Sequence, residues 1–112
     1  MKVLKDPDQV LDILDEKLKE LYKRFDEAGN DEATEISGQE IAIICIAEHV
    51  RYLLDDYKPF KEEDMAGVYK YVNYAKAENY EHRNPRDTLF ARGRAEGAVW
   101  ALKEIEKRME EG

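Results

Sequence analysis

The sequence predicts an all-α fold, a single antiparallel four-helix bundle formed by residues 1–112. Three observations support this prediction. Apolar residues recur at intervals of three and four in four separate stretches, the spacing that places them on one face of a helix. Sequence signals typical of a helix start precede several of these stretches. Glycine and proline, which interrupt helices, occur only six and three times.

The first predicted helix covers residues 7–28. Asp6 can cap its amino end, and Pro7 suits the first helical position, where no backbone N–H is needed. Gly29, directly after the helix, supplies a stop signal. The apolar stripe that should face the core comprises Val10, Leu14, Leu18, Leu21 and Phe25.

The second predicted helix covers residues 38–57. Ser37 and Glu40 have the spacing of a capping box, in which two side chains satisfy free backbone N–H groups at a helix start. The seven-residue apolar run that follows would also suit a buried strand, but the apolar pattern continues to Tyr57, which favours a helix. Apolar positions surround this helix on several sides, so we expect it to lie at the centre of the domain. The polar segment 29–35 before it is expected to form a long surface connection.

The third and fourth predicted helices cover residues 61–81 and 85–109, and Asn84 is expected to cap the fourth. A stripe of small residues runs along the fourth helix, formed by Gly93, Gly97 and Ala101. Each glycine costs about 1 kcal/mol relative to alanine inside a helix. We therefore expect this stripe to pack unusually close to a neighbouring helix, as small residues allow. That neighbour is either the second helix of the same chain, which we favour, or a second subunit, which would make the protein a homo-oligomer.

The composition excludes several classes of partner and location. The formal net charge of −8 argues against binding to anionic membranes and to duplex nucleic acid, sequence-specific DNA binding included. The longest apolar run has seven residues, too few to span a membrane. The single cysteine, Cys45, cannot form an intrachain disulfide and fits a reducing compartment, so a cytoplasmic location is expected. Its place inside an apolar run favours a small buried hydrophobic residue over a reactive nucleophile.

The charge is unevenly distributed, and one segment is basic. Residues 67–94 carry six basic and three acidic side chains, and the same segment holds four tyrosines. Arginine binds phosphate through paired N–H donors, and aromatic rings stack on bases. The sequence therefore predicts a corner that binds a nucleotide-like anionic ligand, formed by Tyr74, Tyr80, His82, Arg83, Arg86, Arg92 and Arg94. A competing interpretation leaves the tyrosines in the core and pairs the arginines with nearby carboxylates.

No catalytic or metal-binding motif stands out in the sequence. Two histidines, His49 and His82, and one cysteine are a poor supply for zinc, which takes three or four nitrogen and sulfur ligands. Small acidic helical proteins include the MazG-type nucleotide pyrophosphohydrolases, which hold Mg²⁺ with glutamates in E-x-x-E and E-x-x-D spacing. Glu40 and Glu48 do not reproduce this spacing, and Arg51 stands where an acid would be needed. We therefore expect a protein that is not an enzyme and has no catalytic residues, metal or cofactor.

The segment from Phe90 to Leu102, which begins FARGRAEGA, resembles the closing helix of many short phage and mobile-element proteins of unassigned function. This resemblance implies a small helical accessory protein that can be oligomeric. Together with the basic corner, it leads to the hypothesis of a cytoplasmic, non-enzymatic inhibitor or sequestering protein for a nucleotide-like ligand. Two alternatives stay open. One is a metal-dependent nucleotide hydrolase, and the other is an acidic interaction module, or DNA mimic, that docks on a basic surface through Asp12, Asp15, Glu16 and Glu20.

Overall fold

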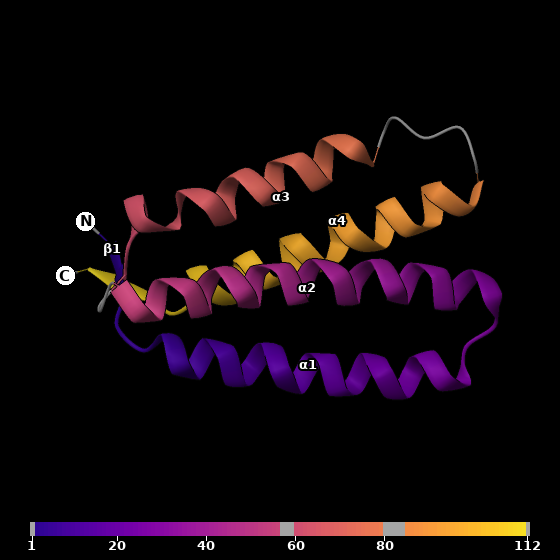
Figure 1. Cartoon of the computed structure of the whole chain (residues 1–112), viewed down its shortest axis with the longest axis horizontal. Coiled ribbons are helices and arrows are strands. Elements are labelled where there is room, and N and C mark those ends of the chain that lie inside the picture. Colours follow the sequence, from indigo (N-terminus) through magenta and orange to yellow (C-terminus); the bar gives the residue numbers. More distant parts are fainter. Residues whose placement is uncertain (1, 57–59, 80–84, 112) are drawn as a thin grey trace.

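A computed structural model of the protein describes residues 2–56, 60–79 and 85–111. Within these ranges the chain is mostly helical, as predicted (Figure 1). The helices are α1 (Pro7–Glu27), α2 (Asn30–Asp56), α3 (Ala66–Glu78) and α4 (Pro85–Glu106), and a short 3-10 helix, η1 (Glu62–Met65), leads into α3. Three short strands accompany them: β1 (Lys2–Leu4), β2 (Phe60–Lys61) and β3 (Met109–Glu111). None of the described helices is long and apolar enough to cross a membrane.

The first predicted helix forms with nearly the predicted bounds. The Asp6 carboxylate accepts a hydrogen bond from the Gln9 backbone N–H at 3.1 Å, and Pro7 occupies the first turn. The apolar stripe is buried except at its carboxyl-terminal end, where Phe25 is 41% exposed. Phe25 was predicted to face the core and does not, because the connection to α2 is only two residues long and the first turn of α2 is polar.

The second helix begins at Asn30 rather than at residue 38, so the predicted capping box and the predicted connection at 29–35 are both wrong. The polar segment is itself helical, and the Thr34 hydroxyl donates a hydrogen bond to the Asn30 carbonyl at 2.9 Å. The extra turns bring Ile36 onto the core, where it is 1% exposed. Tertiary packing of an apolar side chain therefore outweighs a local start signal.

The third predicted helix divides into two parts. Lys61 belongs to β2, and residues 62–65 form η1 before α3 begins. The Lys61 backbone N–H donates a hydrogen bond to the Asp64 carboxylate at 3.0 Å, which closes the 3-10 turn. Residues 80–81 of the predicted helix lie outside the described residues, as does Asn84, the predicted cap of α4.

The closest contact between helices joins α2 and α4 of the same chain. A Cβ atom placed on Gly97 would lie 2.7 Å from the Gln39 carbonyl oxygen and 2.8 Å from its Cα. A Cβ atom on Gly93 would collide with the Glu35 carbonyl oxygen. The glycine stripe of α4 therefore faces the backbone of α2 and not a second subunit.

The α2 side of this contact also contains a glycine, which the sequence interpretation missed. Gly38 is buried, and a Cβ atom there would collide with the Phe90 carbonyl oxygen and lie 2.7 Å from the Arg94 backbone nitrogen. Its role is close packing and not helix capping. Alanines continue the series of small residues along both helices, and Ala42 and Ala101 are fully buried.

The two helices in closest contact run parallel. Glu35 lies opposite Gly93 and Gln39 lies opposite Gly97, so residue numbers rise in the same direction along α2 and α4. Figure 1 shows the same orientation, with α1 and α3 on opposite sides of the α2/α4 pair. In an antiparallel up-down-up-down bundle the second and fourth helices also run parallel, but they face each other across the diagonal, whereas here small residues bring them into contact.

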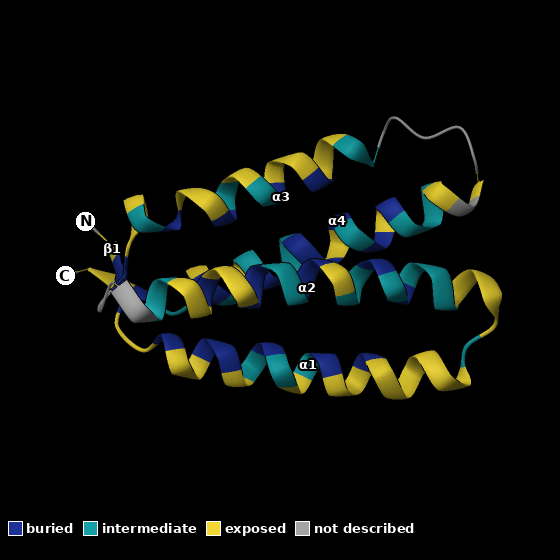
Figure 2. Ribbon diagram, viewed as in Figure 1, coloured by how far each residue is buried: buried dark blue, intermediate teal, exposed yellow. Residues whose placement is uncertain are grey.

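The apolar core lies between the α2/α4 pair and the outer helices. Figure 2 shows buried residues on the inward faces of all four helices. Leu14 and Leu21 of α1 are fully buried, and Val68 and Val72 of α3 are at most 3% exposed. Among the described residues, no polar or charged side chain is buried. The outer helices α1 and α3 thus cover the α2/α4 pair with leucine and valine side chains, which are larger than the glycines and alanines at the contact between α2 and α4.

A three-stranded antiparallel sheet, which was not predicted, covers one end of the helices (Figure 1). β1 lies in the middle, with Leu4 paired to Phe60 of β2 and to Met109 of β3, and all three side chains are buried. α4 ends at Glu106, before the predicted end at residue 109, because Met109 enters the core from a strand. Each strand has two or three residues, too few to show an alternating pattern in the sequence.

Replacing Gly97 with alanine should destabilise the protein, although alanine is the better helix former by about 1 kcal/mol. The added Cβ would meet the Gln39 backbone, which cannot move without separating the helices, and overpacking of this kind costs about 1–3 kcal/mol. Chemical denaturation measures the loss. Gly67→Ala in α3 is the matched control, because its Cβ would lie an ordinary 3.4 Å from the His49 ring. Equal effects of the two substitutions would contradict the close contact.

Candidate functional site

The structure describes the side chains of three of the seven residues predicted to form the ligand-binding corner. Tyr80, His82 and Arg83 lie outside the described residues, and Arg86 is described only as part of the α4 backbone. The remaining three are Tyr74 on α3 and Arg92 and Arg94 on α4.

Arg94 joins α4 to α3. Its guanidinium donates hydrogen bonds to the Tyr71 hydroxyl at 3.1 Å and to the Glu78 carboxylate at 2.7 Å. It also lies over two rings, 5.2 Å from the Tyr71 centroid and 5.3 Å from the Tyr74 centroid. Burial raises the pKa of Tyr71, so its hydroxyl stays protonated. Tyr74 and Arg94 are therefore together, but the arginine is engaged within the chain.

Arg92 points away from this cluster. Residues two apart on a helix do not share a face, and Arg92 donates a hydrogen bond to the Glu35 carboxylate on α2 at 3.2 Å. The described residues of the predicted corner thus divide between two contacts, one with α3 and one with α2. For these arginines the competing interpretation, pairing with nearby carboxylates, describes the observed contacts.

A row of polar side chains borders the glycine contact of α2 and α4. Next to the Arg92–Glu35 pair, the Gln39 side-chain amide donates a hydrogen bond to the Glu96 carboxylate at 3.2 Å. Burial raises the pKa of Glu96, and the negative charge and hydrogen bonding of Glu35 raise it further. The close approach of α2 and α4 therefore brings the carboxyl groups of Glu35 and Glu96 near each other.

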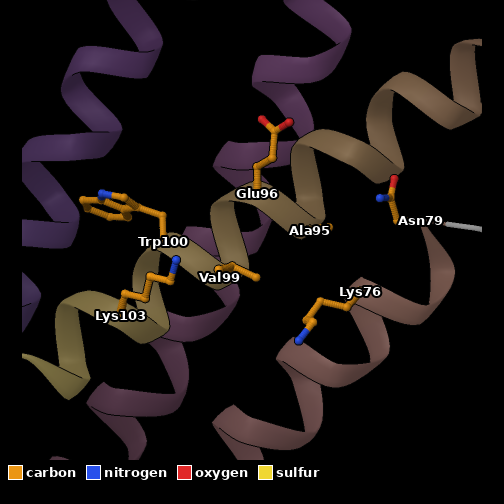
Figure 3. Close-up of a pocket in the computed structure, with 7 residues that line it drawn as sticks. All are labelled: Lys76, Asn79, Ala95, Glu96, Val99, Trp100 and Lys103. Carbon is orange, nitrogen blue, oxygen red and sulfur yellow. The ribbon is translucent and has the colours of Figure 1, made fainter.

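A groove of about 430 Å³ lies between α3 and α4 (Figure 3). Its volume is within the range of small-molecule sites, about 300–1,000 Å³. In Figure 3 the Val99 side chain points toward α3, whereas Trp100 points to the other side of α4, toward α1. The residues that line the groove are Lys76 and Asn79 of the α3 side and Ala95, Glu96, Val99, Trp100 and Lys103 of α4.

The charges at this groove are mainly positive. Within the described part of the chain, neither Lys76 nor Lys103 has an ion-pair partner, whereas the Glu96 carboxylate already accepts a hydrogen bond from α2. The Lys17 ammonium of α1 lies 5.4 Å from the centroid of the Trp100 ring. The groove therefore combines two ammonium groups with an apolar wall and an indole at its edge.

Sequence reasoning missed this groove, although it identified the basic segment to which Lys76 belongs. The partners of Lys76 in the groove are Val99, Trp100 and Lys103, which lie more than twenty residues further along the chain. Only the packing of α3 on α4 brings them together. The signal available in the sequence was the presence of lysines on both predicted helices, and it did not specify which faces would meet.

The alternative acidic docking surface on α1 is less acidic than predicted. Three of its four acids have a basic partner at 3.3–3.9 Å: Asp15 with Arg51, Glu16 with Lys19 and Glu20 with Lys17. For Asp12 no ion pair occurs among the residues that the structure describes. The surface therefore has mixed charge.

For catalysis and metal binding, the described residues offer no group of three or more histidine, cysteine, aspartate or glutamate side chains that could hold a metal ion. Cys45 was predicted to be buried and is instead partly exposed, because it lies on the α2 face beside Tyr71 of α3.

No protein-family model matches the sequence, and neither the curated proteins nor the solved structures include a significant match. Function is therefore inferred from the residues themselves.

Arg94 and Glu78 should show strong energetic coupling in a double-mutant cycle. The Arg94 and Glu78 side chains are 21% and 26% exposed, and a hydrogen bond to a charged group contributes about 1.5–3 kcal/mol. We expect Arg94→Met and Glu78→Gln each to lower the free energy of unfolding, and the double variant to lose less than the sum. Additive losses would show that the pair does not connect α3 to α4.

Glu96→Gln should stabilise the protein at neutral pH. Because the pKa of Glu96 is raised, the folded protein binds more protons than the unfolded chain between pH 4.5 and the folded-state pKa, and the free energy of unfolding falls as pH rises through this window. Glutamine keeps the shape and removes the charge beside Glu35. Denaturant unfolding at several pH values should show a gain at neutral pH that disappears below pH 4.5. A gain in the free energy of unfolding that does not depend on pH would contradict a raised pKa for Glu96.

Proposed function

We propose that this protein is a non-enzymatic, cytoplasmic binding protein that holds a small nucleotide-like anion in the groove between α3 and α4. One observation carries the proposal: Lys76 and Lys103 border the same groove from different helices, and neither has an ion-pair partner within the described part of the chain. An ammonium group binds phosphate as a compact point charge. Val99 supplies an apolar surface that suits a base, and Trp100 lines the edge of the groove with its ring turned toward α1.

The proposed groove adjoins, in sequence, part of the corner predicted from the sequence. Asn79 lines it, and the next residues along the chain include Tyr80, His82 and Arg83 of that corner. Arg92 and Arg94 are engaged with carboxylates on α2 and α3, so the ligand site shifts from the start of α4 toward its middle. The ligand class predicted from the charge distribution is retained in this proposal.

We further propose that the protein acts by sequestering its ligand. The support is the resemblance of the segment from Phe90 to Leu102 to the closing helix of short phage and mobile-element proteins, which implies an accessory role. The homo-oligomer stays a prediction. Gly93 and Gly97, which suggested it, are occupied by α2 of the same chain, so an interface would need other residues.

Isothermal titration calorimetry with nucleoside mono-, di- and triphosphates and cyclic dinucleotides tests the ligand class. At least one should bind, and Lys76→Gln and Lys103→Gln should each weaken that binding about tenfold, equivalent to about 1.4 kcal/mol. Lys23→Gln is the matched control, because Lys23 is an exposed lysine of α1 away from the groove. No heat with any of these compounds would contradict the proposal, as would an equal loss in the Lys23 variant, which would indicate an effect of net charge alone.

A further inference from the structure

α2 presents an apolar face to solvent. Ile41 is 43% exposed and Tyr52 is 70% exposed, and Ile44 and Cys45 between them are partly exposed. Their spacing places them on one side of the helix, away from the buried Ile36, Ala42 and Ile46. A helix that is apolar on all sides is normally covered on all sides. This side of α2 is only partly covered within the described chain.

A groove runs beside this exposed stripe, between α2 and α3. Its volume is about 470 Å³, and its lining residues are Cys45, Glu48, His49, Tyr52 and Tyr71. Tyr74, which is 56% exposed, extends the aromatic surface along α3. From Ile41 to Tyr52 the stripe extends for about 17 Å, or about three helical turns. Stripe and groove together have the size and shape that accept one amphipathic helix.

Acidic side chains of α1 and α2 beside the stripe lack ion pairs among the described residues. Asp26, Glu40 and Glu48 have no ion-pair partner among the described residues, and one carboxyl oxygen of Glu40 is buried without a hydrogen bond. Burial and the charge of Asp26 raise the pKa of Glu40. By contrast, the nearby arginines are engaged, Arg51 with Asp15 at 3.3 Å and Arg94 with Glu78 at 2.7 Å. The face therefore offers apolar contacts together with uncompensated negative charge.

We propose that this face binds a basic amphipathic helix of a partner protein, with apolar side chains along the α2/α3 groove and lysine or arginine beside Glu40 and Glu48. A second copy of this chain is the poorer occupant. A two-fold dimer through this face would place the same acidic residues of both copies against one another, which like-charge repulsion disfavours. This docking surface lies on α2 and α3, separate from the groove that Lys76 and Lys103 border.

Two synthetic peptides of about 20 residues, long enough to form helix, test the proposal. Both carry the same leucine stripe, and the polar face is lysine in one and glutamate in the other. Fluorescence anisotropy should show binding of the lysine peptide and not of the glutamate peptide. Ile41→Ser and Tyr52→Ser should each weaken binding at least about tenfold, or about 1.4 kcal/mol. Glu48→Lys should reduce the preference for the lysine peptide.

Phe25→Ser is the control, because Phe25 is an exposed apolar residue of α1 outside the groove, and this variant should bind like the wild type. Circular dichroism and thermal unfolding of every variant separate loss of binding from loss of fold. Equal binding of the two peptides, absence of binding, or an equal effect of Phe25→Ser would overturn the proposal. A dimer in light scattering that Ile41→Ser dissociates would also overturn it, since a second copy would then cover the face.

Discussion

The contact between the backbones of α2 and α4 is the constraint on which the rest of the structure depends. Gly38, Gly93 and Gly97 remove the side chains that would hold the two helices apart. Each glycine costs about 1 kcal/mol of helix stability, which closer dispersion contacts along both helices offset. Carbonyl oxygens of one helix lie against Cα atoms of the other, a geometry that recurs at close helix interfaces. With this pair fixed, α1 and α3 can only pack on its two sides.

Both candidate surfaces follow from that arrangement. Because α2 and α4 are in contact, α3 has grooves against each of them, one lined by Lys76 and Lys103 and the other by Glu48 and Tyr52. The first groove is basic and the second is apolar with uncompensated acid. The Arg94 contact with Tyr71 and Glu78 holds α3 on the pair and so separates the two grooves. A small acidic chain thereby obtains two surfaces of different chemical character.

Local sequence patterns predicted the helices well where local interactions decide them. The cap at Asp6, the proline at the start of α4 and the need for close packing at Gly97 could all be recognised from short segments. The start of α2 could not, because the burial of Ile36 decides it from a distance. The parallel pairing of α2 and α4 and the short terminal strands depend on which elements meet, which periodicity does not encode.

The candidate site shows the same division. The basic, tyrosine-rich segment was visible in the sequence, and Tyr74 and Arg94 do come together. The ion pairs that engage Arg92 and Arg94 were anticipated only as an alternative, because Glu35 is distant in sequence and its carboxylate comes near only through the α2/α4 contact. The groove between Lys76 and Lys103 was missed for the same reason.

Isotope-filtered nuclear Overhauser spectroscopy on a mixture of labelled and unlabelled protein tests the central contact most directly. We expect strong cross-peaks between the Hα protons of Gly97 and Gln39, and of Gly93 and Glu35, within labelled chains. We expect no such cross-peaks between labelled and unlabelled chains. Cross-peaks only between chains would assign the glycine stripe to a subunit interface. Their complete absence would show that α2 and α4 do not pack in the parallel register described, and either result would contradict the α2/α4 contact within one chain.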